Sequence, residues 1–335
     1  MQDSTKKKIA KAAVITAGVG AACGAAVFSF SNFVYDQIFT AKAMVKRGNP
    51  FVLEPAEKER YLKNPNTIHD DRTWFACMEP IEETIQSKRG ENLHAEYLKP
   101  AVGSHIWCLC IHGWTSCPQN VAIPARHFYE KGWNVLIPHM RGHGKSEQKN
   151  VSMGWFDRLD MLDWIDFIIA RDPEAQIFLI GVSMGSATVM MTGGEQLPRN
   201  VKALIADCGY TSVWDEISCE IKDMFHLPVH PLCDAFRLVT MARAGYDIKK
   251  ASSVEQLKKC TTPILFIHGQ EDTFVPYHML QKVYDAAENC EKDMLSVPDA
   301  AHANSWDIHP ELYWPKVDSF LAKHLNLASG NEKAS

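Results

Sequence analysis

The sequence predicts an α/β fold in which a mostly parallel central sheet is flanked by helices, and three observations support this prediction. Continuous apolar runs recur from residue 105 onward, and stretches of helical character separate them. A strand that is apolar throughout is buried on both faces, which is typical of a parallel sheet covered by helices on both sides. The composition, with 46% hydrophobic and 22% charged residues, is that of a soluble globular protein with a real core.

Six apolar runs are expected to be strands of this sheet. They are HIWCLCI (105–111), WNVLIP (133–138), AQIFLIG (175–181), VKALIA (201–206), TPILFIH (262–268) and MLSV (294–297). Ahead of them, EETIQS and NLHAEYL alternate polar and apolar residues and are separated by KRGE. This pattern predicts a two-stranded hairpin at the start of the sheet.

A covering helix is predicted over residues 153–170. Its expected buried stripe follows a three-and-four spacing and comprises Phe156, Leu159, Leu162, Ile165, Ile168 and Ile169. Four aspartates recur every third residue beside that stripe: Asp157, Asp160, Asp163 and Asp166. We interpret them as a solvated flank of the helix rather than as a metal site.

The segment 209–250 breaks the alternation of strand and helix and is rich in aromatic residues, Met and His. Since it lies between two core strands, we predict a small helical cap above the sheet. The whole chain then divides into a basic, apolar N-terminus (1–31), a helical stem or linker (32–79), a catalytic domain (80–325) that carries the cap, and a flexible tail (326–335).

The N-terminus carries the features of a membrane span or a signal peptide. Four lysines (Lys6, Lys7, Lys8 and Lys11) precede nineteen residues, 12–30, without a charge. This length suffices to span a bilayer, and the preceding positive charge predicts a single-pass protein of the cell membrane with an extracytoplasmic catalytic domain. Secretion after signal cleavage and a cytoplasmic surface helix remain the alternatives.

Charge and cysteine usage exclude several classes of function. A net charge of −5 without long basic runs offers no face for nucleic acid. Ten cysteines without a CxxC pair make zinc an improbable ligand, and most are expected to be small buried residues rather than a disulfide framework. No metal or organic cofactor is therefore expected, and nothing in the sequence indicates the oligomeric state.

Ser183 stands at the centre of the candidate site. In GVSMG (181–185) it lies between a predicted buried strand and an apolar helix, at the sharp turn known as a nucleophile elbow. Gly181 and Gly185 are expected to be obligatory, because a side chain at either position would collide with the neighbouring strand or helix. A serine hydroxyl also needs a general base and an orienting carboxylate, in the chain order Ser, acid, His.

Asp272 and His302 fulfil these requirements. Asp272 follows the strand PILFIH, and His302 follows MLSV, so both are expected at the carboxyl edge of the sheet that holds Ser183. Asp207, which follows VKALIA, is the rival acid. His309 is the rival base, but it precedes Pro310 at the expected start of a helix.

The remaining site residues are backbone donors. The amides of Met184 and Trp114 are expected to form the oxyanion hole, with His112 and Gly113 shaping the turn before Trp114. The segment RGHGKS (141–146) fails as a phosphate loop because the required first glycine is His139. Arg141 and His143 are expected to hold backbone groups of that rim loop by hydrogen bonds.

Taken together, the motifs HGW, RGHGKS, GVSMG and HGQEDTFVP and the late histidine resemble those of the α/β-hydrolase superfamily over about residues 80–325. The basic start, the apolar span and the stretches GWFDRLDMLDWIDFI and DCGYTSVWDE are similar to bacterial membrane-anchored or cell-surface α/β hydrolases. The resemblance implies cleavage of small-molecule carboxylic esters by a Ser183–Asp272–His302 triad. A peptidase or amidase of the same fold, and an inactive surface protein that only binds, remain the alternatives.

Overall fold

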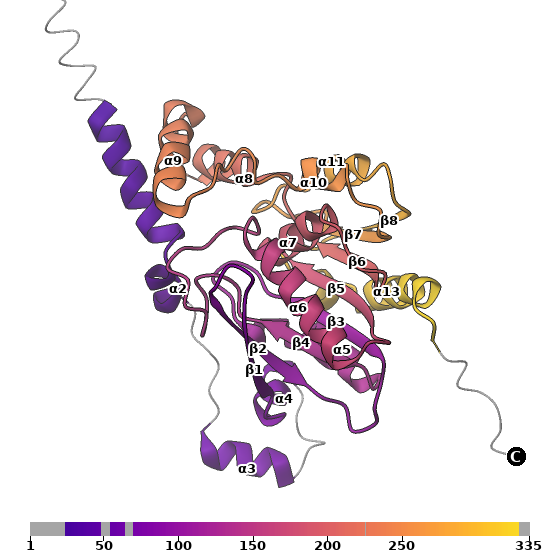
Figure 1. Cartoon of the computed structure of the whole chain (residues 1–335). Coiled ribbons are helices and arrows are strands. Elements are labelled where there is room, and N and C mark those ends of the chain that lie inside the picture. The colour runs from indigo at the N-terminus through magenta and orange to yellow at the C-terminus, as the bar shows by residue number, and fades with distance from the viewer. Residues whose placement is uncertain (1–23, 48–53, 64–69, 225, 328–335) are drawn as a thin grey trace, which may run out of the picture.

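The computed structural model describes residues 24–47, 54–63, 70–224 and 226–327 (Figure 1). At its centre lies an eight-stranded sheet of order β1-β2-β4-β3-β5-β6-β7-β8. The strands are β1 (Ile81–Gln86), β2 (Asn92–Leu98), β3 (Ile106–Ile111), β4 (Asn134–Pro138), β5 (Gln176–Val182), β6 (Val201–Asp207), β7 (Ile264–Gly269) and β8 (Lys292–Val297). The β1–β2 and β2–β4 pairs are antiparallel, and all the other pairs are parallel. The mostly parallel sheet and the hairpin are thereby confirmed.

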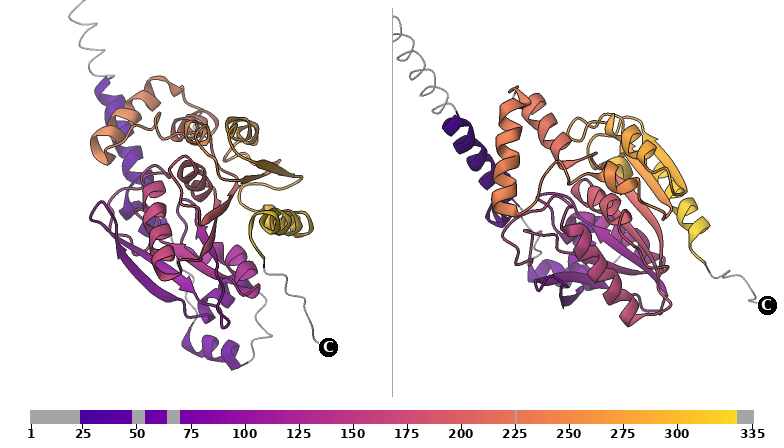
Figure 2. Two further views of the ribbon diagram at one scale, coloured as in Figure 1. Left: turned by 45° about the vertical axis from the view of Figure 1, so that its right-hand side comes forward. Right: turned by 45° about the horizontal axis from the view of Figure 1, so that its top comes forward.

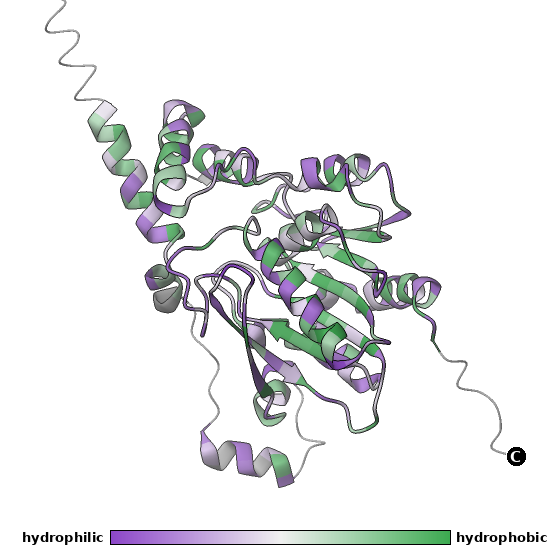
Figure 3. Ribbon diagram, in the orientation of Figure 1, coloured by the Kyte–Doolittle hydropathy of each residue, from purple (hydrophilic) through white to green (hydrophobic). Residues whose placement is uncertain are grey.

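Helices cover both faces of the sheet (Figures 1 and 2). One layer contains α6 (Asp157–Arg171), α7 (Met184–Gly193), α10 (Ser253–Leu257) and α11 (Met279–Ala286). The opposite layer contains α4 (Asp71–Cys77), η2 (Pro118–Val121), α5 (Ala122–Glu130), α12 (Ser305–Ile308) and α13 (Pro310–His324). Trp107 and Leu109 of β3 join the first core and Cys108 joins the second, so alternate side chains of one strand serve both layers. Figure 3 shows the central strands as nearly continuous hydrophobic segments.

Helix α6 corrects the predicted aspartate flank. Asp157, Asp160 and Asp163 are buried, and only Asp166 of the four is exposed. The helix therefore buries a face rotated from the predicted stripe, with Met161, Trp164, Ile165 and Ile168 inside and Leu159 and Leu162 half-buried. The aspartates are buried because Arg141 of the rim loop lies against this side of the helix. Its Nε donates to Asp160 Oδ2 at 2.6 Å.

Between β6 and β7 the chain forms α8 (Val213–Cys219), η3 (Glu220–Met224) and α9 (Val229–Ala244) before it returns to the sheet at α10. These helices lie above the carboxyl edge of the sheet, in the segment for which a cap was predicted (Figure 1).

The segment before β1 is helical. A helix whose described part is residues 24–38 is followed by α2 (Ala41–Arg47), α3 (Pro55–Lys63) and α4. Helix α4 packs on α5 and buries Trp74 and Phe75 in the second core, although it precedes the predicted start of the catalytic domain.

Part of the predicted N-terminal span, residues 12–23, and residues 328–335 of the predicted tail lie outside the described residues. None of the helices in the described part of the chain has both the length and the hydropathy that a bilayer crossing requires.

Candidate active site

Ser183 lies at the turn between β5, which ends at Val182, and α7, which begins at Met184. Its backbone has φ 57° and ψ −118°, a conformation that costs free energy for a residue with a side chain. The turn is held by the Ser183 amide, which donates to the Asp207 carbonyl at 2.9 Å. A strained serine between a buried strand and a helix is the geometry of a nucleophile elbow.

The two glycines that flank Ser183 are confirmed as sterically required. A Cβ on Gly181 would lie 2.3 Å from the Gly185 carbonyl oxygen, and one on Gly185 would lie 2.2 Å from the carbonyl oxygen of Ile111 in β3. Both contacts are with backbone, which has no alternative rotamer. Close approach of α7 to the sheet therefore depends on the absence of these side chains.

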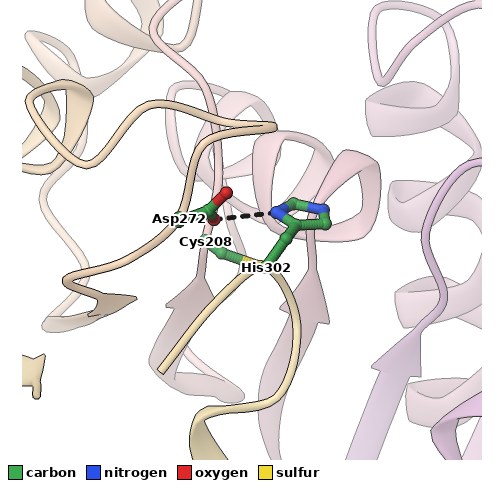
Figure 4. Close-up of side chains that lie close together, drawn as sticks. All are labelled: Cys208, Asp272 and His302. Atoms are coloured by element: carbon green, nitrogen blue, oxygen red, sulfur yellow. Dashed lines mark hydrogen bonds and ion pairs between the residues drawn. The ribbon is translucent and has the colours of Figure 1, made fainter. Parts of the chain in front are cut away.

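Asp272 and His302 meet Ser183 at the carboxyl edge of the sheet. His302 Nε2 lies 2.9 Å from Ser183 Oγ. His302 Nδ1 lies 2.8 Å from Asp272 Oδ2, and Figure 4 shows this contact. The three side chains come from the loops after β5, β7 and β8, separated by up to 119 positions in the chain. One imidazole thus bridges a hydroxyl and a carboxylate.

Asp272 is held in place by its own loop. Its Oδ1 accepts the amides of Phe274 and Val275, both at 3.0 Å, and its Oδ2 lies 3.2 Å from His268 Nε2. Burial acts to raise the pKa of this carboxyl, but the hydrogen bonds from His268 and His302 prevail and lower the pKa below its ordinary value. The side chain is therefore an anion over the whole neutral range.

The rival acid, Asp207, lies elsewhere in the same core. Its Oδ2 accepts a hydrogen bond from the Tyr313 hydroxyl at 3.0 Å, and its side chain is fully buried. Burial raises the pKa of Asp207 to about 7, opposite to the shift of Asp272. The rival base, His309, binds Glu311 at 2.7 Å. The geometry therefore brings Asp272 and His302, rather than their rivals, to Ser183.

The predicted oxyanion donors flank the serine. Met184 is the first residue of α7, where backbone amides lack partners within the helix, and Trp114 follows β3 on the adjacent strand. Both residues line the same cavity as Ser183. Near Trp114, the Thr115 amide donates to His143 Nε2 at 3.2 Å, and the Met140 amide donates to His112 Nε2 at 3.2 Å.

His112 and His143 hold backbone groups, as expected, and remain neutral. Burial lowers the pKa of both imidazoles, and the nearby His143 adds to the effect on His112. The expectation for Arg141 is wrong. Its guanidinium binds the carboxylates of Asp160 and Glu91, because a cation buried at the rim requires anionic partners that a carbonyl cannot replace.

An apolar cavity of about 350 Å³ opens beside Ser183, within the size range of small-molecule sites. Its lining residues are Phe30, Phe33, Val34, Gln37, Ile38, Trp114, Met153, Ser183, Met184, Tyr210, Glu216, Ile217, Glu220 and Phe274. The predicted cap segment, 209–250, supplies Tyr210, Glu216, Ile217 and Glu220. Five lining residues come from helix 24–38, which was predicted to lie outside the catalytic domain.

Two groups near the site were missed from the sequence. His268 supports Asp272 from within β7, and its position four residues before the acid is a signal that could have found it. Glu216 lines the cavity although its side chain is buried, and burial, together with the neighbouring Glu220, raises its pKa well above the ordinary value. A glutamate in an ordinary cap helix gives no sequence signal of this kind.

Cys208, Asp272 and His302 bring a thiol, a carboxylate and an imidazole within 4.8 Å of one another (Figure 4). Burial and the nearby Asp207 raise the pKa of the Cys208 thiol well above its usual range, whereas a metal ligand must be a thiolate. The donor set therefore fits a metal poorly. All nine cysteines within the described ranges have free thiols.

Comparison with known proteins gives the family context of this geometry. A family model described as the α/β-hydrolase fold matches residues 107–221. The uncharacterized protein YqkD of Bacillus subtilis is 24% identical over 272 residues, which are 81% of this chain and 88% of YqkD. A thermostable monoacylglycerol lipase of a Bacillus species is 21% identical over 251 residues, covering 65% of this chain and 91% of the lipase.

Solved structures share the fold of this chain. The esterase Pf2001 of Pyrococcus furiosus aligns with a TM-score of 0.58 and 20% identity, over 82% of this chain and 99% of the esterase. An acylaminoacyl peptidase of Pyrococcus horikoshii aligns with a TM-score of 0.57 and 17% identity, over 76% of this chain but only 43% of the peptidase.

This chain therefore has the α/β-hydrolase fold, as the resemblance of its motifs implied. The likeness to membrane-anchored members of that superfamily stays a prediction.

Proposed function

We propose that this protein is a serine hydrolase that cleaves carboxylic esters through an acyl-enzyme intermediate. The observation that carries the proposal is the position of His302, whose two ring nitrogens lie within 2.9 Å of Ser183 Oγ and Asp272 Oδ2 at the edge of an apolar cavity. Such an arrangement serves nucleophilic catalysis, because the imidazole takes the proton that the serine must lose.

In the proposed acylation step, Ser183 Oγ attacks the ester carbonyl while its proton passes to His302 Nε2. Asp272 accepts the hydrogen bond of His302 Nδ1–H, which fixes the ring tautomer and stabilises the imidazolium. The amides of Trp114 and Met184 would donate to the oxyanion. His302 then protonates the leaving alcohol. A water molecule, activated by the same imidazole, releases the acid and restores Ser183.

The proposal extends to location. The lysine-rich start and the uncharged stretch 12–30 support a single-pass membrane protein with an extracytoplasmic catalytic domain, or a secreted one after cleavage. Alkaline carbonate washing of membranes from cells that make the full chain tests the anchor. A soluble protein with an intact N-terminus would contradict both versions.

Ser183→Ala tests the chemistry. Hydrolysis of a short p-nitrophenyl ester should fall by several orders of magnitude, up to roughly a million-fold. A fluorophosphonate probe should label the wild-type chain and not the variant. If the wild type hydrolyses no ester and is not labelled, the protein is a binder that only retains the fold.

The peptidase alternative has one specific support, which is the fold shared with the acylaminoacyl peptidase. A p-nitrophenyl ester and a p-nitroanilide with the same acyl group distinguish the two activities. We expect the ester to be the better substrate by at least an order of magnitude in kcat/KM. A preference for the anilide would assign the site to amide hydrolysis.

A further inference from the structure

The helix over residues 24–38 belongs to the active site, although it precedes Ser183 by more than 140 positions in the chain. In both Figures 1 and 2 this indigo helix runs alongside the cap helix α9. Tyr35 and Phe39 are completely buried, and their rings lie 6.2 and 5.2 Å from that of Phe236 in α9. The helix is thus packed into the main core and is not a free stem.

Polar contacts fix the end of this helix to the loops around Ser183. The Trp114 indole Nε1 donates to the Ile38 carbonyl at 3.0 Å, which ties the helix to a predicted oxyanion residue. The Val151 amide donates to the Phe39 carbonyl at 2.9 Å, and Arg243 Nη2 donates to Asp36 Oδ1 at 2.6 Å. The helix therefore has a defined position relative to the nucleophile.

One face of the helix is directed into the cavity beside Ser183. The lining residues recur at intervals of three and four: Phe30, Phe33, Val34, Gln37 and Ile38. Four of these five are apolar, and Trp114, Met153, Ile217 and Phe274 add further apolar lining beside Glu216 and Glu220. Along its length the cavity therefore suits a hydrocarbon group attached to the reacting carbonyl.

A second, smaller apolar depression adjoins the cavity along the helix. Phe30 and Val34 also line this depression, which they share with Ile221, Leu227 and Phe236. Phe30 and Phe33 are 43% and 60% exposed and so lie at the outer end of the site. An acyl chain that starts at Ser183 would follow the helix outward from Ile38 toward Phe30.

We propose that helix 24–38 is the wall that selects esters of long acyl chains. The proposal rests on the proposed esterase activity and adds its substrate class. Each methylene buried against such a wall should improve kcat/KM by roughly fourfold. Selectivity for chain length would then come from a segment that precedes the predicted catalytic domain (80–325) in the chain.

The experiment uses the full chain and p-nitrophenyl esters from acetate to dodecanoate, so that only the acyl group changes. Val34→Trp fills the cavity and should reduce the ratio of kcat/KM for dodecanoate to kcat/KM for acetate at least tenfold. Phe33→Ala removes an outer contact and should reduce the dodecanoate value roughly fivefold, mainly through KM. Phe28→Ala is the matched control, since Phe28 is 47% exposed on the same helix but is not a lining residue.

The acetate rate of each variant shows that its catalytic site is folded, so the test does not depend on Val34→Trp alone. Equal ratios of dodecanoate to acetate in the wild type, Val34→Trp and Phe33→Ala would overturn the inference and leave the esterase proposal intact. If the wild type hydrolyses none of the esters, the result would instead reject the proposed function.

Discussion

The two sides of the cavity are built differently. On the catalytic side, Ser183, Asp272 and His302 each follow a strand of one parallel sheet, and hydrogen bonds to backbone hold the serine and the aspartate. On the opposite side, helix 24–38 and α9 are held by ring packing and an exposed ion pair. The difference teaches that the serine and the aspartate depend on backbone geometry, whereas the contact of the wall helix with α9 depends on replaceable side chains.

The largest effect should come from the acid on the catalytic side. Asp272→Asn is expected to lower kcat by about 10⁴-fold, because an amide favours the wrong tautomer of His302. The matched variant Asp207→Asn should stay within about tenfold of wild type, because its side chain contacts Tyr313 and not His302. Ester hydrolysis by both variants checks this contrast. The reverse ranking would make Asp207 the orienting acid.

The same two carboxyls differ in their effect on stability. Burial raises the pKa of Asp207 from 3.8 to about 7 in the folded protein, so the folded state keeps a proton that the unfolded state loses above pH 4. Stability should therefore fall between pH 4 and pH 7, by about 4 kcal/mol from this group. Asp272 has the opposite effect. Because its pKa is lowered in the folded protein, its contribution to the free energy of unfolding is lost as the pH falls.

Urea unfolding of wild type and Asp207→Asn across pH 4 to 7 measures this contribution. The variant should show a smaller decline in the free energy of unfolding as the pH rises. Parallel curves for the two proteins would mean that Asp207 titrates normally.

A smaller effect is expected for the glycine contact behind the nucleophile. Gly185→Ala should lower the free energy of unfolding by about 1–3 kcal/mol or more, since the added Cβ would lie 2.2 Å from the Ile111 oxygen. It should also reduce activity, because α7 would shift away from β3. Gly103→Ala has no atom within 4 Å of the new Cβ and should stay within about 0.5 kcal/mol. Thermal unfolding of Gly185→Ala and Gly103→Ala, each compared with wild type, measures these two losses of stability.

The smallest effect should come from the wall. Asp36→Asn removes an ion pair whose side chains are 52% and 35% exposed, and the loss should be under about 1 kcal/mol. High salt should reduce the difference further. If the variant were instead strongly destabilised at every salt concentration, the helix would be held mainly by this pair and not by the packing of Tyr35 and Phe39.

Sequence patterns predicted the parts of the molecule that are local in the chain. The six predicted core strands are mostly apolar runs, the hairpin strands alternate polar and apolar residues, and Ser183 is marked by its two neighbouring glycines. Asp272 and His302 were found because the ends of parallel strands share one edge, so strand order alone brings them together.

The remaining features depend on contacts between distant segments. No sequence pattern near Asp160 indicates that it will form a buried ion pair with Arg141. Likewise, no pattern in residues 24–38 indicates that the helix will pack on Phe236. A helix of apolar and polar residues before a domain resembles a linker until its partner surface is known. The cavity wall was therefore missed, whereas the triad geometry was anticipated.

The glycine contact has a consequence for how this protein can change over generations. The atoms that oppose a Cβ at Gly181 or Gly185 belong to the main chain, which every amino acid carries alike. No second substitution at the opposing positions can make room. A genetic screen for suppressors of Gly185→Ala should consequently return reversion to glycine far more often than compensating replacements at Ile111.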